Sequence, residues 1–304
     1  MADFTRIATN IAALQSLNSL QNINNKLGVA QLRLSTGKRI NSAADDAAGL
    51  TIATKFDFKA KGLGQVLANI ADAKSLISVA EGHLNNINDI LTKMKTKATQ
   101  AANDTLGADE RTAISNELKQ LNTQIDNEVR QAQWAGVHLL VGSNCTFASA
   151  STVGSFNFQV GVGTTTADKM SFQIASQVFG ANSTQSEMAF NSRDLKVQIG
   201  SGTSEWSVAS QASANEFMAK VDAASLKVSQ GLSYIGAIVN RLDYQEASLS
   251  VAKVNTEASW NRIMNADMAY EQLEATKYQI LQQTAVTMLA QANMGPQAIL
   301  GLFR

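Results

Sequence analysis

Proline and cysteine are almost absent from this sequence. Its 304 residues contain one proline, Pro296, and one cysteine, Cys145, whereas proline usage is normally about 5%. A single cysteine excludes an internal disulfide framework and a cysteine-rich zinc module. Proline removes a helix hydrogen bond and clashes with the preceding turn, so a chain that avoids it keeps long helices uninterrupted. We therefore expect long helices, with Gly295-Pro296 ending the last one.

Aromatic residues, net charge and long apolar runs are also scarce. Aromatics make up 6% of the chain, which predicts an aliphatic core, and 25 basic residues balance 25 acidic ones. Zero net charge argues against phosphate-neutralising nucleic-acid binding and against a polybasic membrane clamp. The sequence contains no run of about 18 apolar residues, so it predicts no membrane-spanning helix. The start lacks the pattern of a cleavable secretory signal, which by itself favours a cytoplasmic protein.

Apolar residues at helical spacing dominate the first part of the chain. A first stripe (Leu20, Ile23, Leu27, Ala30, Leu34) predicts a helix that ends at Gly37, and Ser42 is the expected cap of the next helix. A sustained heptad then predicts a coiled-coil seam roughly 50 Å long. Its members are Val66, Ile70, Ala73, Ile77, Ala80, Leu84, Ile87, Leu91, Met94, Ala98 and Ala101. A helix with Ile114, Leu118, Leu121, Ile125 and Val129 on one face follows and should pack antiparallel to it.

The middle of the chain changes to period-two alternation. Residues 156–160 and 170–174 flank a Gly- and Thr-rich turn, which predicts a β-hairpin. Residues 195–199 and 206–208 suggest a second, smaller hairpin. From about 212 the helical pattern returns and predicts one nearly continuous helix to Met294. Its heptad register includes Ile235, Ile238, Leu242, Leu249, Ala252, Ile263, Ala266, Tyr270, Leu273 and Ile280, and a shifted stripe (Leu281, Ala285, Met288, Ala292) follows.

These patterns define the expected fold class. The chain should be mainly α with a β-rich middle, in which N- and C-terminal arms pair as a long antiparallel coiled-coil rod with the hairpin at its distal end. The arms carry more apolar residues than two helices can cover, namely Ile11, Leu14, Leu17 and Leu20 with Leu281, Met288 and Leu289. This surface must meet another chain.

Motifs for catalysis or cofactor binding are missing. The sequence has no phosphate-binding Gly-rich loop ending in Lys-Ser/Thr, no HExxH, no Cys-x-x-Cys and no Gly-x-Ser-x-Gly. His83 and His138 are better interpreted as rim or packing residues than as metal ligands. Asp45-Asp46 fits a helix N-terminus, where carboxylates complement the helix dipole. We expect no enzyme activity, no cofactor and no metal.

Two long motifs resemble bacterial flagellin. Residues 8–14 (Ala-Thr-Asn-Ile-Ala-Ala-Leu) and 33–50, which include Ser-Thr-Gly-Lys-Arg-Ile-Asn-Ser and Asp-Asp-Ala-Ala-Gly, look like the family's N-terminal signature. Residues 236–242, 279–283 and 288–293 look like its C-terminal one. The likeness covers roughly 1–175 and 212–304, and Gln159-Val160-Gly161 also resembles the family's hairpin.

The resemblance implies a filament subunit for swimming motility. It divides the chain into an inner-tube domain (1–44 with 262–304), an outer-core bundle with a hairpin at about 139–178 (45–180 with 212–261), and a short variable surface insertion (181–211). It implies unfolded passage through the type III export apparatus with an export chaperone, and assembly at the tip beneath the filament cap, next to hook-associated junction proteins. The localisation would then be the extracellular filament, which replaces the cytoplasmic expectation. The residues expected to carry self-assembly are Ile11, Leu14, Leu34, Arg39, Asn41, Asp45, Leu281, Met288, Leu289, Leu300 and Phe303.

One segment departs from the family pattern. Residues 91–97 match the face that many flagellins present to Toll-like receptor 5, but receptor-active members have Arg in place of Lys93 and Leu in place of Lys97. Ile114 and Glu117 match. Lysine is a poor substitute for the planar fork of arginine, so we expect weak receptor activation.

Two other functions compete with a filament subunit. A hook–filament junction protein shares helical termini but usually lacks the full 35–49 motif. A helical cytoplasmic signalling rod would share the Ala- and Gln-rich helices, but it fits the apolar C-terminal tip and the β-rich middle less well.

Overall fold

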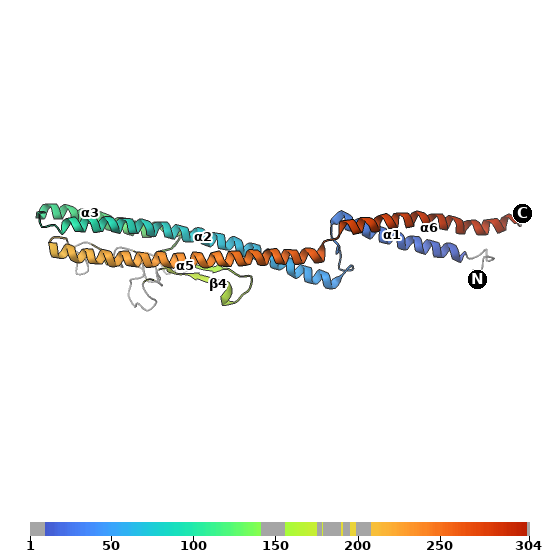
Figure 1. Ribbon diagram of the computed structural model, residues 1–304, viewed down its shortest axis with the longest axis horizontal. Helices are drawn as coiled ribbons and strands as arrows, with labels where there is room; N and C mark the ends of the chain where they lie inside the picture. The colour runs from blue at the N-terminus through green and yellow to red at the C-terminus, as the bar shows by residue number, and fades with distance from the viewer. Residues whose placement is uncertain are drawn as a thin grey trace. The chain divides into compact units, whose positions relative to one another are not determined.

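The protein forms two compact units. The computed structural model describes residues 10–140, 156–174, 178, 190, 195–198 and 208–302, with 295–302 as backbone only. The first unit consists of Met1–Ala60 with Val254–Arg304, and the second of Lys61–Lys253. Helices α2 (Ala47–Ala101) and α5 (Gln211–Met264) contribute residues to both units. Figure 1 labels the helices of each unit.

In the first unit, α1 (Ile11–Thr36) and α6 (Met268–Leu302) lie side by side and antiparallel (Figure 1). The amide of Gln282 donates to Asn24 over 2.8 Å, and the guanidinium of Arg33 contacts Glu271 at 3.2 Å. The predicted stripe of α1 faces α6, because Leu27 and Ala30 are buried with Ala275 while Leu34 packs against them. The antiparallel pairing of the two arms is confirmed.

The expected continuous C-terminal helix is interrupted at residues 265–267. α5 ends at Met264 and α6 begins at Met268. The backbone at the break pairs with the segment that follows α1: Arg39 N–H donates to Met264 O over 2.7 Å, and Ala266 N–H donates to Gly37 O over 3.0 Å. The prediction of a continuous helix was wrong because Met264 O and Ala266 N–H bond to the segment after α1 instead of to their own helix. The spacing of apolar residues does not reveal such contacts.

The ends of α1, α2 and α6 near this segment each have a capping residue. Gly37 ends α1 with a left-handed φ of 68°, as expected. Asp267 opens α6, since its Oδ1 accepts from the N–H groups of Ala269 and Tyr270. The residue that caps α2 is Asp46, which accepts from Gly49 N–H over 2.8 Å. Ser42, the expected cap, instead donates to Asp45.

Pro296 does not end the last helix. α6 continues through it to Leu302. Proline removes one backbone donor from a helix and leaves the carbonyl four residues earlier without its helical partner. Here that carbonyl belongs to Ala292, and it accepts instead from the side-chain Nδ2 of Asn10 over 2.8 Å. A substitute donor therefore allows the helix to pass the proline.

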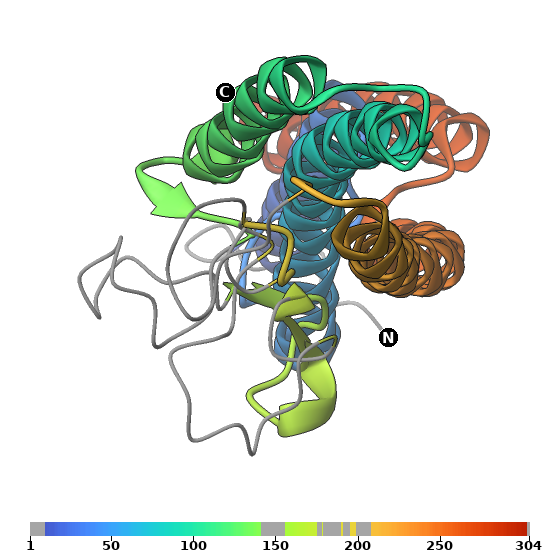
Figure 2. The ribbon, with the colours of Figure 1, turned by 90° about the vertical axis from the view of Figure 1, so that its left-hand side faces the viewer.

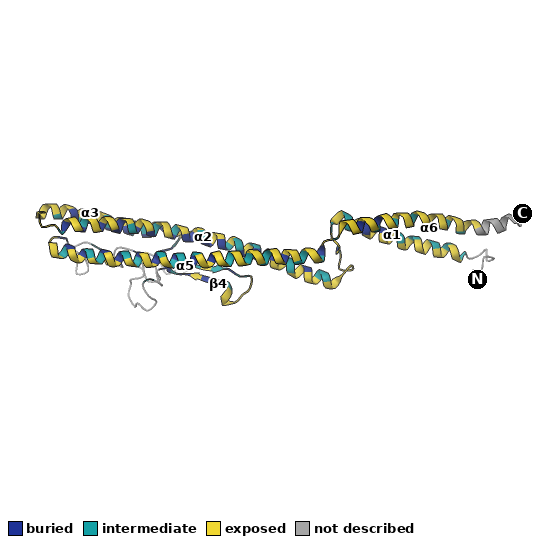
Figure 3. Cartoon of the chain, viewed as in Figure 1, coloured by how far each residue is buried: buried dark blue, intermediate teal, exposed yellow. Residues whose placement is uncertain are grey.

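The second unit is built on α2, α3 (Ala108–Gln131) and α5, which Figure 2 shows side by side around a common core. Every member of the predicted heptad from Val66 to Ala101 is buried in this core. Antiparallel packing of α3 on α2 is also confirmed, since His83 contacts Glu128 at 2.8 Å and Lys97 contacts Glu117 at 2.8 Å. The buried dark-blue stripes of these helices can be followed in Figure 3.

Polar contacts fix α5 against α2 from the outside. Lys74 pairs with both Asp243 and Glu246, and Lys95 Nζ lies 2.6 Å from Asp222. The residue numbers fall on α5 as they rise on α2, so these two helices are also antiparallel. The core of the second unit is mostly aliphatic, which agrees with the low aromatic content of the sequence, but it also contains the buried side chains of Phe172, Phe190 and Phe217.

The first predicted hairpin is confirmed. Strands β3 (Phe156–Gln159) and β4 (Lys169–Phe172) pair antiparallel, with Phe156 opposite Phe172. The turn contains the short 3₁₀ helix η1 (Thr166–Asp168), capped by Thr165. A second, short pair, β1 (Gln133–Trp134) with β2 (Val137–His138), follows α3.

Two contacts place the β3–β4 hairpin against α2. Asn69 donates to Gln159 O over 3.4 Å, and Val162 lies so close to Gly62 that a side chain there would collide with it. The hairpin therefore packs beside residues 62–69 of α2. The absent side chain of Gly62 makes room for Val162 at this site.

The second expected hairpin is not found where the chain is described. Leu195 and Lys196 form a turn, and residues 197 and 198 are not part of a strand. Leu195, Val197 and Val208 are buried in the core of the second unit. Most of the insertion expected at 181–211, and part of the expected hairpin region at 139–178, lie outside the described residues.

Candidate self-assembly surface

Large apolar side chains on α1 and α6 are exposed. Leu14 is 61% exposed, and Ile11, Leu281 and Met288 are also classed as exposed. Figure 3 shows the yellow, exposed faces that run along both helices. The buried core between α1 and α6 is small compared with the length of these helices. Its apolar exterior is therefore a candidate surface for contact with other chains.

The exposed face of α6 includes residues that were expected on its buried seam. Tyr270, Leu273 and Ile280 continue the heptad of α5, but all three are exposed. The break at 265–267 restarts the helix, so the residues that face α1 are Glu271, Ala275, Tyr278 and Gln282. The heptad register expected for α6 was therefore wrong. Tyr270, Leu273 and Ile280 lie on the exposed face instead of the buried one and add to its apolar surface. Val29 and Leu32 of α1 are also exposed and were not among the expected residues.

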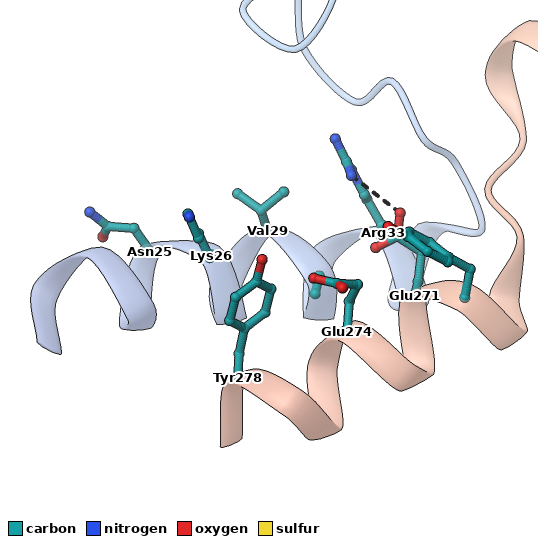
Figure 4. A pocket seen from close by; sticks show the side chains of 9 residues that line it. Asn25, Lys26, Val29, Arg33, Glu271, Glu274 and Tyr278 are labelled. Carbon is teal, nitrogen blue, oxygen red and sulfur yellow. Dashed lines mark hydrogen bonds and ion pairs between the residues drawn. The ribbon is translucent and has the colours of Figure 1, made fainter. Parts of the chain in front are cut away.

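A shallow recess of about 330 Å³ lies between α1 and α6 (Figure 4). Lys26 and Arg33 reach it from α1, and Glu271, Glu274 and Tyr278 reach it from α6. The hydrogen bond to Glu274 raises the pKa of Tyr278, while Lys277 and Tyr278 together hold the pKa of Glu274 below its ordinary value. The recess thus presents basic groups on one wall and acidic and phenolic groups on the other.

Three of the expected assembly residues are engaged within the chain. Arg39 Nη2 donates to Ile263 O over 3.1 Å, and the Asn41 side chain donates to Lys38 O over 3.0 Å. Asp45 accepts from the backbone N–H groups of Ser42 and Asn41, which hold its pKa below its ordinary value. These residues fix the segment between α1 and α2.

The remaining expected assembly residues differ in their surroundings. Leu34 and Leu289 are half-buried. For Leu300 the structure describes the backbone within α6 and not the side chain, and Phe303 lies outside the described residues. Cys145 also lies outside them.

The residues compared with the receptor-binding face do not share one surface. Lys93 is exposed, and Lys97 forms an ion pair with Glu117. Ile114, however, is only 6% exposed and belongs to the core of the second unit. A partner at this face would meet the lysines and Glu117 rather than Ile114.

His83 forms a structural contact between α2 and α3. His83 Nδ1 contacts Glu128, which also accepts from Asn86 and Gln124. Among the described residues no cluster of three or more His, Cys, Asp or Glu could hold a metal ion. No helix in the described ranges is long and apolar enough to cross a membrane.

Comparison with known proteins identifies the family. Residues 7–145 match the bacterial flagellin N-terminal helical region, and residues 218–303 match the bacterial flagellin C-terminal helical region. The chain belongs to the bacterial flagellin family. It is 33% identical to flagellin FlaB2 of Treponema pallidum and 33% identical to the flagellar filament 33 kDa core protein of Treponema phagedenis, each over 97% of this chain and 98% of the relative. The crystal structure of Bacillus cereus flagellin aligns with a TM-score of 0.46 and 22% identity, over 60% of this chain and 88% of that one.

Proposed function

We propose that this flagellin-family chain is the structural subunit of a helical flagellar filament, in which copies pack through the exposed faces of α1 and α6. The observation that carries the proposal is the exposed apolar surface of these paired helices. Isolated helices gain most of their stability from packing, so this surface is costly in a free subunit. A contact between two different faces of the same molecule produces a helical polymer when the rotation between neighbouring copies does not close into a ring.

The matches to filament proteins support this function over the alternatives. The relatives described as flagellins and filament core proteins match nearly the whole chain. A hook–filament junction protein remains the second candidate on the basis of its similar helical termini. We propose no catalytic role.

Seeded polymerisation of the purified chain tests the proposal. Leu14→Asn should raise the critical concentration at least about ten-fold, because burying a leucine side chain is worth roughly 1.5–3 kcal/mol. Leu226→Asn is a matched control, since Leu226 of α5 in the second unit has the same 61% exposure. Equal effects of the two substitutions, or a wild-type chain that stays soluble with seeds, would contradict the proposal.

Removing residues 281–304 provides a second test. The truncated chain should not polymerise, whereas the α2–α3–α5 core of the second unit should keep its helical circular dichroism, because none of its residues is removed. Normal filaments seen by electron microscopy would overturn this expectation.

We further propose the assembly route and domain roles that the family implies. Residues 1–44 with 262–304 would line the inner tube, 45–180 with 212–261 would form the outer core, and 181–211 would be a surface insertion. The subunit would leave through the type III apparatus with an export chaperone, assemble beneath the filament cap next to hook-associated junction proteins, and reside in the extracellular filament. Pull-down of the chain by each purified component tests these partners.

Weak activation of Toll-like receptor 5 completes the proposal. The ion pair between Lys97 and Glu117 supports it, because a partner would have to break or accommodate that pair. Lys97→Leu with Lys93→Arg should strengthen activation in reporter cells, with Lys119→Leu on the exposed side of α3 as control. Full activation by the unmodified chain at low concentration would refute the expectation.

A further inference from the structure

Asn10 makes two hydrogen bonds that join α1 to α6. Its Oδ1 accepts from Ala13 N–H over 3.0 Å, which is the capping bond at the start of α1. Its Nδ2 donates to the backbone oxygen of Ala292 over 2.8 Å. Both bonds require the same orientation of the side-chain amide, because only the nitrogen can donate and only the oxygen can accept.

The oxygen of Ala292 is available because of the residue four positions later. In a helix it would accept from the N–H of residue 296, but Pro296 has no N–H. Since α6 continues to Leu302, this carbonyl stays within a regular helix without a helical donor. A backbone carbonyl left unpaired at a packed surface costs free energy. Asn10 supplies the missing donor.

We propose that Asn10 and Pro296 form a matched pair that sets the register of α1 against α6. Sliding the helices by one residue would leave Ala292 without a donor and would place Nδ2 beside a carbonyl already bonded within the helix. Two further polar contacts across this pair, Gln282 with Asn24 and Arg33 with Glu271, use long side chains on at least one partner and tolerate sliding better. The inference rests on the proposed function in one respect: the register decides which apolar residues the unit offers to neighbouring copies.

Asn10→Asp separates the two roles of Asn10. Aspartate keeps an oxygen that can cap α1, but its ionised carboxylate cannot donate to Ala292. Pro296→Ala restores a backbone donor for the same carbonyl. Asn10→Asp should therefore be costly in the presence of Pro296 and nearly neutral in its absence. A residue that only capped α1 would tolerate aspartate in both backgrounds.

Amide hydrogen exchange of the soluble full-length chain measures the coupling without polymerisation. In Asn10→Asp, exchange in residues 11–17 and 286–294 should be about five-fold faster, which corresponds to one hydrogen bond of ~1 kcal/mol. In the Pro296→Ala background the same substitution should change exchange less than about two-fold. An unchanged rate in Asn10→Asp, or an equal effect in both backgrounds, would overturn the inference.

The critical concentration of seeded polymerisation then connects the pair to assembly. It should rise in Asn10→Asp and return toward the Pro296→Ala value in the double variant. Coupling in exchange with a wild-type chain that does not polymerise would support the register pair and count against the proposed function. Polymerisation of the wild type without coupling in exchange would support the proposed function and count against the register pair.

Discussion

Replacing Asn122 by leucine should stabilise the second unit. Asn122 is 6% exposed and lies on the buried face of α3 between Leu118 and Ile125. Within the described part of the chain, neither its Nδ2 nor its Oδ1 has a hydrogen-bond partner. A buried amide without partners costs about 1–3 kcal/mol, so the native residue is an unfavourable choice for this position.

The size of the effect follows from two favourable contributions and one unfavourable contribution. Leucine removes the cost of the unpaired amide and adds a buried apolar side chain, which is worth roughly 1.5–3 kcal/mol. The different shape of leucine in a packed core costs about 1–3 kcal/mol. We expect the free energy of unfolding of the second unit to rise by about 2 kcal/mol.

Amide exchange in α3 and urea unfolding followed by circular dichroism measure this change. Asn116→Leu, at an exposed position of the same helix, is the control and should shift stability by less than about 0.5 kcal/mol. Asn122→Ala should gain less than leucine, because alanine leaves unfilled space. A less stable Asn122→Leu chain would refute the reasoning, since it would mean that the amide is satisfied in solution.

Three further predictions address single positions. Gly37→Ala should destabilise the first unit by about 1 kcal/mol in urea unfolding, because Gly37 has a φ of 68°; an unchanged midpoint would contradict it. Gly231→Ala should cost about 1–3 kcal/mol of thermal stability, since its Cβ would lie 3.0 Å from Phe190, and Gly236→Ala, where the Cβ meets nothing within 4 Å, is the control. The pKa of Asp45 is lowered in the folded chain, so its contribution to stability is present above its ordinary pKa of about 3.9 and is lost as the pH falls through the lowered value. The difference in unfolding midpoint between Asp45→Asn and the wild type should therefore shrink below about pH 4, and a constant difference would contradict the assignment.

Patterns of apolar residues predicted the second unit well. The heptad from Val66 to Ala101 and the stripe of α3 are buried as expected, because helix periodicity and burial are coupled wherever a helix runs unbroken. The β3–β4 hairpin was also found from its alternation. Its position beside Gly62 was not, since that depends on a contact between residues distant in the sequence.

The sequence patterns did not predict the helix break at 265–267 or the hydrogen bond from Asn10 to Ala292 O. The apolar heptad passes through residues 265–267 without a gap, and only Asp267 as a capping residue signals a new helix start. We expected Pro296 to end α6 because proline cannot donate a helical hydrogen bond. Asn10, near the other end of the chain, instead donates to the carbonyl of Ala292 that Pro296 leaves without a helical donor. On the candidate assembly surface, Ile11, Leu14, Leu281 and Met288 could be predicted from the excess of apolar residues on the two arms. The exposure of Leu273 and Ile280 required knowledge of the break.

The Asn10–Ala292 contact also constrains the order of folding. The two residues are separated by 282 positions, and Arg33 and Glu271 by 238. Closing loops of this length makes such pairing slow compared with local contacts. In a chain that emerges from its N-terminus, α1 must wait for nearly the whole sequence before its partner exists, while α2 and α3 can already pair as a local helical hairpin. Helix α1 is thus synthesised first but is among the last helices to pack against its partner.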